Sequence, residues 1–402
     1  VLIPRNMTHS LSLHEARKLV LHSQRLPATK QSGNATTATL AAIEHLAYIQ
    51  IDTISAIQRA HHHTLWNRNP RYDPEQLTQL VADKQVFEYW SHAAAYLPMC
   101  DYRFSLPRKK AIASGEQRHW YAPDKKLMNA VLKRISAEGP LMAKDFEHSG
   151  KKLGEWTSKP AKRALESLFM QGELMISSRV NFHKVYDLSE RVLPPNINTT
   201  TPSPQEYARF LITRYLQANG LGQIAEIGYL LKNIKPLLTA TAREMCANGE
   251  LLNINVAGSH YYALAASLDL LNKPLARNKL AILSPFDNLL IQRKRMQTLF
   301  DFDYLIECYV PEKKRQFGYF SLPILWNGQL VARMDCKADR RASHLHIHHL
   351  AVEASLKKIE EFSQALCKAL PAFMKFNNCE HLSLHKTTPK NLPPLATMID
   401  LP

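Results

Sequence analysis

The sequence is poor in glycine and lacks the short motifs of several common enzyme classes. Glycine occurs only 13 times in 402 residues, about half of its usual frequency of roughly 7%. The sequence contains no G-x-x-x-x-G-K-[ST] phosphate loop, no G-x-G-x-x-G dinucleotide motif and no G-x-S-x-G nucleophile turn. These absences argue against ATP-driven, dinucleotide-dependent and serine-hydrolase chemistry.

Cysteine is also sparse, and no long apolar run is present. The six cysteines stand at positions 100, 246, 308, 336, 367 and 379, and no two of them form C-x-x-C. This spacing excludes a zinc ribbon and a thioredoxin-like motif, and a chain with so much core material does not need disulfides. No apolar run approaches the about 18 residues of a membrane span, and the first residues do not resemble a signal peptide. We expect reduced thiols, a cytoplasmic location and no membrane partner.

What the chain does contain is core-forming material and positive charge. Of its residues 45% are apolar and 21% are charged, which indicates a globular protein. Its mass of 45.8 kDa indicates two to four domains. Lysine and arginine number 51 against 35 acidic residues, a net charge of +16 and a pI of about 9.5. Such an excess favours a polyanionic partner, most often nucleic acid, although an anionic membrane would also fit.

One pattern occurs twice. Residues 168–176 and 244–252 each read as the end of a helix, a glycine and an apolar strand, and residues 185–188 and 261–264 read as returning strands. Helices followed by a two-stranded hairpin are typical of the winged variant of helix-turn-helix.

Helix-start signals place further helices around these hairpins. Asp124 and Ser203 precede amphipathic stretches, and Ser12 with Glu15 forms a capping box near the N-terminus. We interpret the N-terminal part as a third, degenerate copy. From residue 269 the pattern changes to strands at 319–325, 330–336, 344–352 and 381–385, with one helix at 355–374.

The expected fold is α+β, with three tandem winged-helix units followed by a small C-terminal β-barrel. The predicted domains are residues 1–120, with the candidate catalytic motif, 121–198, 199–268 and 269–402.

The candidate catalytic residues lie at 49–54, where three isoleucines and polar residues alternate. As a strand, or as an extended entry to the next helix, this segment would hold Gln50 and Asp52 side by side on one face. By itself, such a pair is more often the solvated face of a strand.

The surrounding residues resemble a known family. The first block is residues 48–54, 58–68 and 72–74, read as YIQIDTI, QRAHHHTLWNR and YDP. The second block, about 240 residues later, comprises Leu283-Ser284-Pro285-Phe286-Asp287-Asn288-Leu289, Arg293, Arg295, Leu299-Phe300, Phe302-Asp303-Tyr304, Glu307-Cys308-Tyr309-Val310-Pro311, Lys314-Arg315, Gly318-Tyr319 and Leu322-Pro323. Together they resemble the AlkZ/YcaQ family of winged-helix bacterial DNA glycosylases. The resemblance implies an active-site Gln-apolar-Gln or Gln-apolar-Asp motif. The Asp form in Gln50-Ile51-Asp52 is similar to the YcaQ-like members, which act on alkylated purines and unhook interstrand crosslinks.

The chemistry suits these residue types. Breaking an N-glycosidic bond builds positive charge on the sugar, which the carboxylate of Asp52 can stabilise while it holds or deprotonates the attacking water. Gln50 would orient the water or the sugar. A purine alkylated at N7 is already cationic and leaves without a general acid, so one carboxylate suffices. No lysine is indicated as a Schiff-base former. We expect monofunctional hydrolysis that leaves an abasic site, without metal or cofactor.

The expected partner is double-stranded DNA containing alkylated or crosslinked purines. No dimerisation element is evident, so we expect a monomer, associated with the nucleoid. The candidate DNA-binding residues are Arg59, His61, His62, Lys159, Lys162, Arg163, Arg293 and Arg295. Solvated surface is the alternative for about half of these basic residues, and internal support is the alternative for Arg59.

Two other interpretations stay open at this point. His344, His346 and His348 alternate, so three imidazoles on one strand face could bind zinc, although no acidic or cysteine ligand is close in sequence. The chain could also be a non-catalytic winged-helix regulator. A regulator would tolerate Asp52→Asn, whereas a glycosylase would lose turnover and keep DNA binding.

Overall fold

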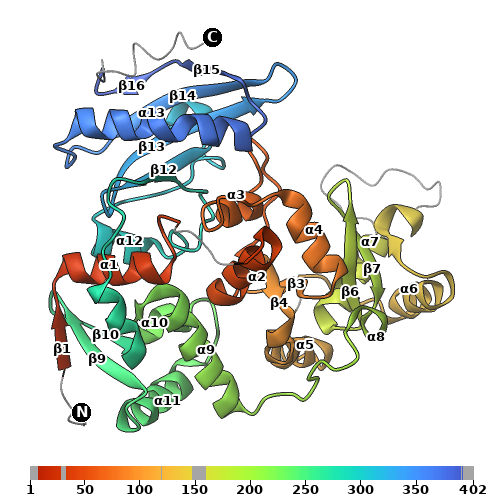
Figure 1. The fold of residues 1–402 in the computed structure, drawn as a ribbon. Helices are drawn as coiled ribbons and strands as arrows, with labels where there is room; N and C mark the ends of the chain where they lie inside the picture. The colour runs from red at the N-terminus through yellow and green to blue at the C-terminus, as the bar shows by residue number, and fades with distance from the viewer. Residues whose placement is uncertain (1–7, 29–32, 119, 147–159, 391, 393–402) are drawn as a thin grey trace.

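The N-terminal third of the chain is mainly helical and carries one small sheet (Figure 1). The structure is a computed structural model that describes residues 8–28, 33–118, 120–146, 160–390 and 392. The first elements are β1 (Thr8–Leu11), α1 (Leu13–Ser23), α2 (Ala35–Leu46), β2 (Ile49–Gln50), α3 (Ala60–Trp66), α4 (Pro74–Ala82), β3 (Val86–Trp90), β4 (Ala94–Pro98), the 3₁₀ helix η1 (Met99–Ser105) and α5 (Leu106–Ala113). Strands β2, β4 and β3 pair in that order.

The middle of the chain contains both predicted hairpins. The elements are α6 (Lys125–Glu138), β5 (Leu141–Met142), η2 (Ala143–Phe146), α7 (Pro160–Gln171), β6 (Leu174–Val180), β7 (His183–Leu188), α8 (Ser189–Val192), α9 (Pro204–Asn219), β8 (Leu221–Gly222), α10 (Ile224–Ile227), α11 (Lys235–Ala247), β9 (Leu251–Val256) and β10 (Ser259–Leu264). The hairpins β6–β7 and β9–β10 each follow a helix, as the repeated pattern predicted. The winged-helix interpretation and the domain boundaries stay predictions.

Local capping fixes the helix starts that the sequence predicted. The Ser12 side chain accepts from the amide of Glu15, and the Glu15 carboxylate accepts from the amide of Ser12 at 2.8 Å. Ser203 and Glu206 form the same reciprocal pair at the start of α9. Each pair satisfies donors that the helix itself leaves unpaired.

The C-terminal part is an open sheet, so the predicted β-barrel is wrong. Its elements are η3 (Ala265–Asn272), β11 (Leu280–Ile282), α12 (Arg293–Phe300), η4 (Glu312–Lys314), β12 (Ser321–Trp326), β13 (Gln329–Asp339), β14 (His344–Val352), α13 (Ile359–Phe376), β15 (His381–Leu384) and β16 (Thr387–Thr388). The sheet order is β11-β12-β13-β14-β15, with β16 also on β14. Among the described residues β11 and β15 do not pair with each other. Helix α13 lies across one face instead (Figure 1) and supplies buried Phe362, Leu366 and Phe373, so the sheet has a second layer without closing.

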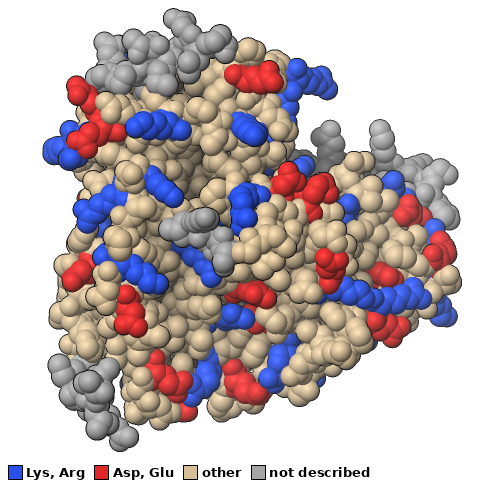
Figure 2. Space-filling model, viewed as in Figure 1, with Lys and Arg blue, Asp and Glu red and all other residues tan. Residues whose placement is uncertain are grey.

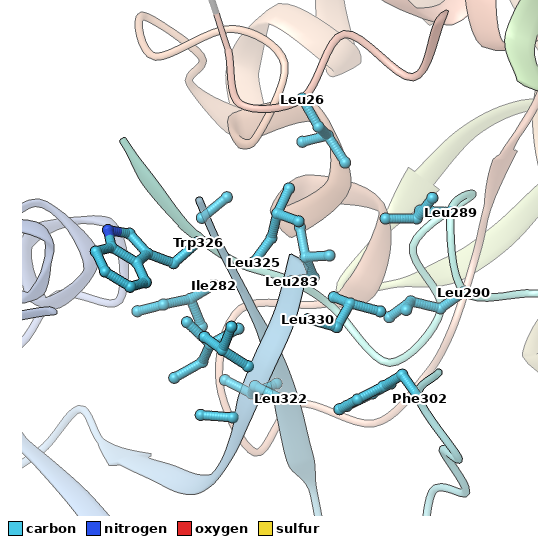
Figure 3. Close-up of a cluster of buried hydrophobic side chains, with 14 of the residues drawn as sticks. Leu26, Ile282, Leu283, Leu289, Leu290, Phe302, Leu322, Leu325, Trp326 and Leu330 are labelled. Atoms are coloured by element: carbon cyan, nitrogen blue, oxygen red, sulfur yellow. The ribbon is translucent and has the colours of Figure 1, made fainter. Parts of the chain in front are cut away.

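One hydrophobic core joins the two ends of the chain. Leu19 and Leu26 belong to the same buried cluster as Leu283, Leu325 and many side chains of the C-terminal sheet. Figure 3 shows Leu26 directed toward this group. Strand β1 also pairs in parallel with β9 of the middle region. This shared core holds the N-terminal motif against the C-terminal region. In the part of the chain that is described, no helix is long and apolar enough to cross a membrane.

Candidate active site

The motif lies where a short strand gives way to a loop. Gln50 pairs with Ala95 of β4, and the amide of Ile51 donates to the carbonyl of Ala94 at 2.8 Å. Strand β2 ends at Gln50, so a full strand over 49–54 is wrong, and the other expectation, an extended entry to the next helix, remains. Directly after the strand, the Asp52 carboxylate accepts from the amide of Ile54 at 2.7 Å and so forms a side-chain turn. Gln50 therefore lies on β2, and Asp52 lies in the loop directly after it.

The loop that carries Asp52 is fastened to the C-terminal region. The carbonyl of Ala56 accepts from the amide of Ala338 at 2.7 Å, and the amide of Gln58 donates to the side chain of Asn377 at 2.8 Å. Ile57 between them is fully buried in the shared core. The loop thus has a defined position although it contains no regular secondary structure.

A buried ion pair joins the two sequence blocks that carry the family resemblance. The guanidinium of Arg68 donates to both carboxylate oxygens of Asp287, and both side chains are fully buried. Arg68 also donates to the backbone and the side chain of Gln24. Next to this pair, the Asn288 amide donates to the carbonyl of Tyr48 at 2.9 Å, two residues before Gln50. The second sequence block therefore contacts the backbone next to the candidate motif Gln50-Ile51-Asp52.

The carboxylate of Asp52 is partly buried and electrically coupled to a second loop. Burial raises the pKa of Asp52, and the hydrogen bond from Ile54 opposes this rise. Burial also raises the pKa of the Cys308 thiol, and the negative charge of Asp52 raises it further. The pKa of Tyr309, whose side chain is 82% exposed, rises for the same two reasons and because of Cys308. The loop around residues 307–311 therefore lies close enough to Asp52 to feel its charge.

Gln50 is oriented by a histidine that sequence analysis did not single out. The ring Nε2 of His92 lies 2.8 Å from Oε1 of Gln50. Burial lowers the pKa of His92 to about 4, so the ring is neutral at pH 7 and its N–H can donate to the amide oxygen. This leaves the amide NH₂ as the outward donor of Gln50. A lone histidine carries no spacing signal, and only the pairing of β2 with β4 brings it to the motif.

Arg59 lies in a cluster of positive charge. Its guanidinium stacks over the ring of Phe182, 4.0 Å from the centroid, at the turn between β6 and β7. Burial lowers the pKa of Arg59, and the charges of Arg340 and Arg179 lower it further. Arg179 is paired with Glu88. With the charge of Arg179 compensated by Glu88, Arg340 is the like charge that favours an anion beside Arg59.

Of the two neighbouring histidines, His61 is buried and His62 is half-buried. His61 is 1% exposed and stacks on Phe182 with 5.8 Å between ring centroids. His62 places Nδ1 2.7 Å from the hydroxyl of Tyr72, and burial lowers its pKa to about 4. Their surroundings indicate packing against the β6–β7 hairpin and against Tyr72 just before α4, and argue against the predicted contact with DNA.

The remaining predicted DNA-binding residues divide into exposed and buried ones. Lys162 and Arg163 are exposed near the start of α7, and Arg293 is exposed at the start of α12, whereas Lys159 lies outside the described residues. Arg295 is 3% exposed.

Arg295 has two internal partners. Its guanidinium pairs with Glu226 at 3.0 Å and donates to the carbonyl of Asn219 at 2.8 Å. Its burial leaves no surface for DNA, which corrects the expectation for this residue, and its role is to join α12 to α9 and α10.

The histidines of β14 do not form a zinc centre in this arrangement. His344 and His346 stack with 4.3 Å between centroids and 8° between ring planes, and His348 continues the stack. Nearly parallel rings cannot direct their nitrogens at one ion. Among the residues that the structure describes, no group of three or more His, Cys, Asp or Glu side chains is placed to hold a metal.

Comparison with known proteins supports the family resemblance. Residues 43–376 match the family model described as DNA glycosylase AlkZ-like. This match covers most of the chain, and the chain belongs to the AlkZ-like DNA glycosylase family.

A solved structure has a similar fold. The DNA glycosylase AlkZ of Streptomyces sahachiroi matches with a TM-score of 0.66 and 17% sequence identity, over 94% of this chain and 100% of that chain. At this identity the likeness concerns the fold.

Proposed function

We propose that this chain is a monofunctional DNA glycosylase that hydrolyses the N-glycosidic bond of N7-alkylated purines in double-stranded DNA and leaves an abasic site. We further propose that it belongs with the YcaQ-like members and unhooks interstrand crosslinks. The observation that carries the proposal is the partly buried carboxylate of Asp52, held by the amide of Ile54 at the end of the strand that bears Gln50.

Asp52 is suited to stabilising a positively charged sugar. As the bond from C1′ to the purine N9 breaks, its electron pair moves to the base and neutralises the cationic ring. The sugar acquires the positive charge, and a partly desolvated carboxylate interacts with it more strongly than one in water would. The oxygen of a water molecule then bonds to C1′, and Asp52 takes up the proton that this water releases. No second carboxyl group is needed, because the base leaves as a neutral molecule.

Gln50 is suited to positioning. Its amide oxygen is directed at the neutral ring of His92, so its NH₂ group is available to donate to the attacking water or to the sugar. A fixed donor of this kind lowers the barrier through orientation and does not itself exchange protons.

We propose that basic residues at several separate places in the chain bind the DNA. The candidates that remain after the structure is considered are Arg59, Lys162, Arg163 and Arg293, and Lys159 remains a candidate from the sequence alone. Figure 2 shows Lys and Arg interspersed with Asp and Glu over the visible face, so the basic excess is not gathered into one patch in this view. We propose that a monomer contacts the phosphates at separated points.

The test uses a duplex with one N7-methylguanine, incubated with and without the protein in the absence of metal or cofactor, and then either treated with alkali or kept cold at neutral pH, because heat alone releases this base and breaks abasic strands. We expect strand cleavage at the lesion only after alkali, and none with Asp52→Asn, which should still bind the duplex. Cleavage without alkali would contradict monofunctional hydrolysis. DNA binding without base release from this substrate or from a crosslinked duplex would favour the regulator.

Crosslink unhooking needs its own substrate. A duplex with one interstrand N7-guanine crosslink runs as a single slow species on a denaturing gel. We expect the wild-type protein to convert it to separate strands, one carrying the adduct, and Asp52→Asn to leave it intact. If the protein releases N7-methylguanine but leaves the crosslinked species unchanged, its activity is confined to lesions that involve only one strand of the duplex.

A further inference from the structure

An exposed leucine occupies an unfavourable backbone position between α10 and α11. Leu230 is 68% exposed and has a φ of +58°, in the left-handed region that favours glycine or asparagine. In the free protein the Leu230 side chain is mostly in contact with water, so it contributes little hydrophobic stabilisation. A glycine or an asparagine would adopt this backbone conformation at a lower free-energy cost. Such a combination is typical of a residue kept for contact with a ligand.

The turn that carries Leu230 is rigid. The amide of Tyr229 donates to the carbonyl of Glu226 at 3.2 Å, and the amide of Leu231 donates to the carbonyl of Gly228 at 3.0 Å. Gly228 packs so closely that a Cβ there would meet Ile234 at 3.1 Å. Glu226 is itself held by the buried Arg295. The leucine therefore projects from a fixed base.

This turn adjoins the candidate catalytic residues. The ring of Tyr229 lies 6.2 Å from the ring of His92, whose Nε2 contacts Gln50. Tyr229 is itself 40% exposed, and Lys232, two residues after Leu230, is exposed. Leu230 is therefore an apolar side chain close to the cation Lys232, and its neighbour Tyr229 contacts His92. A lysine near an apolar tip favours a polyanion such as DNA over a protein surface as the partner.

We propose that Leu230 is a wedge that enters the minor groove of DNA beside the lesion and opens the adjacent base step. This inference rests on the proposed glycosylase function. The C1′ atom of a nucleotide borders the minor groove, so a wedge on that side would widen the approach to C1′ without requiring the base to be fully extruded. Other minor-groove proteins insert apolar side chains between base pairs in this way. The base stack would also bury the apolar surface that Leu230 exposes in the free protein.

The first arm of the test compares two glycine substitutions. Leu230→Gly and the matched control Ala257→Gly both remove a side chain from an exposed left-handed position, since Ala257 has a φ of +48° in the turn between β9 and β10. We expect both to raise the melting temperature slightly. Only Leu230→Gly should slow single-turnover base release from N7-methylguanine duplex, by about 10- to 100-fold, as loss of one buried leucine implies.

The second arm reports on the DNA without requiring catalysis. A 2-aminopurine next to the lesion should brighten when the wild-type protein or Leu230→Met binds, and stay dark with Leu230→Gly at saturating protein. If Leu230→Gly releases base and brightens the probe as the wild type does, the wedge is wrong and the glycosylase proposal stands. A wild type that releases no base but brightens the probe through Leu230 overturns the glycosylase proposal and supports the wedge.

Discussion

Lys109 is buried in an aromatic cage, and we predict that replacing it with methionine stabilises the protein. The side chain is 3% exposed, and its Nζ is without a hydrogen-bond partner among the described residues. The rings of Tyr102, Tyr89 and Phe87 surround the ammonium at 4.1, 4.7 and 5.6 Å. Burial lowers the pKa of Lys109 from 10.5 to about 7.

The size and pH dependence of the effect follow from this difference in pKa. Below pH 7 Lys109 is protonated in both states, and burial of its charge costs the folded protein about 5 kcal/mol by the pKa difference alone. Contact with the rings offsets about 2 kcal/mol of this cost, which leaves a net cost of about 3 kcal/mol. Because the folded pKa is depressed, the unfolded chain binds the extra proton between pH 7 and 10.5. The cost therefore shrinks as pH rises through that range.

The assay is urea unfolding of Lys109→Met and the wild type at pH 7 and at pH 10. We expect the variant to gain about 3 kcal/mol at pH 7 and less than about 1 kcal/mol at pH 10. Lys110→Met, at the exposed neighbouring position, is the matched control and should change little at either pH. Equal gains at both pH values would show that packing, not charge, is responsible. A loss of stability at pH 7 would show that the rings hold the ammonium better than water does.

Three further predictions concern the site and its support. Arg68→Ala should lower the free energy of unfolding by about 3–5 kcal/mol, because it leaves Asp287 charged and buried; Lys358→Ala, in an exposed pair, should change it by less than about 0.5 kcal/mol. The base-release rate should fall with acidification at a pH above the pKa of an exposed aspartate, because burial raises the pKa of Asp52 and the ionised form is active; a rate unchanged down to pH 4 would oppose this. His92→Phe should lower the single-turnover rate about 10-fold without changing DNA affinity, since it removes one hydrogen bond to the side-chain amide of Gln50.

Local signals in the sequence predicted much of the secondary structure. The capping residues Ser12 and Ser203 begin helices, and the repeated helix–hairpin pattern corresponds to β6–β7 and β9–β10, because caps and hairpins depend on residues a few positions apart. Strand β1 could not be foreseen, since its partner β9 lies more than 240 residues away. The open C-terminal sheet was missed because strand patterns do not reveal whether the two edges meet.

The sequence identified candidate residues of the site but did not show how they are placed relative to one another. The Gln50-Ile51-Asp52 motif and its resemblance identified two candidates, but alternation alone did not show that the strand ends at Gln50 or that the Asp52 carboxylate forms a turn with the amide of Ile54. Arg295 looked like surface because its neighbours are basic, and only the position of Glu226 explains its burial. His92 carried no signal at all, since its role arises from strand pairing.

The central claim is that the carboxylate of Asp52 performs the hydrolysis, and the most direct test is single-turnover release of N7-methylguanine by the wild type, Asp52→Asn and Asp52→Glu, with duplex affinity measured in parallel. We predict that Asp52→Asn keeps its affinity and loses a factor on the order of 10² to 10³ in rate, as loss of one preorganised charge implies, while Asp52→Glu keeps part of the activity. Asp52→Asn releasing the base at the wild-type rate would contradict the account.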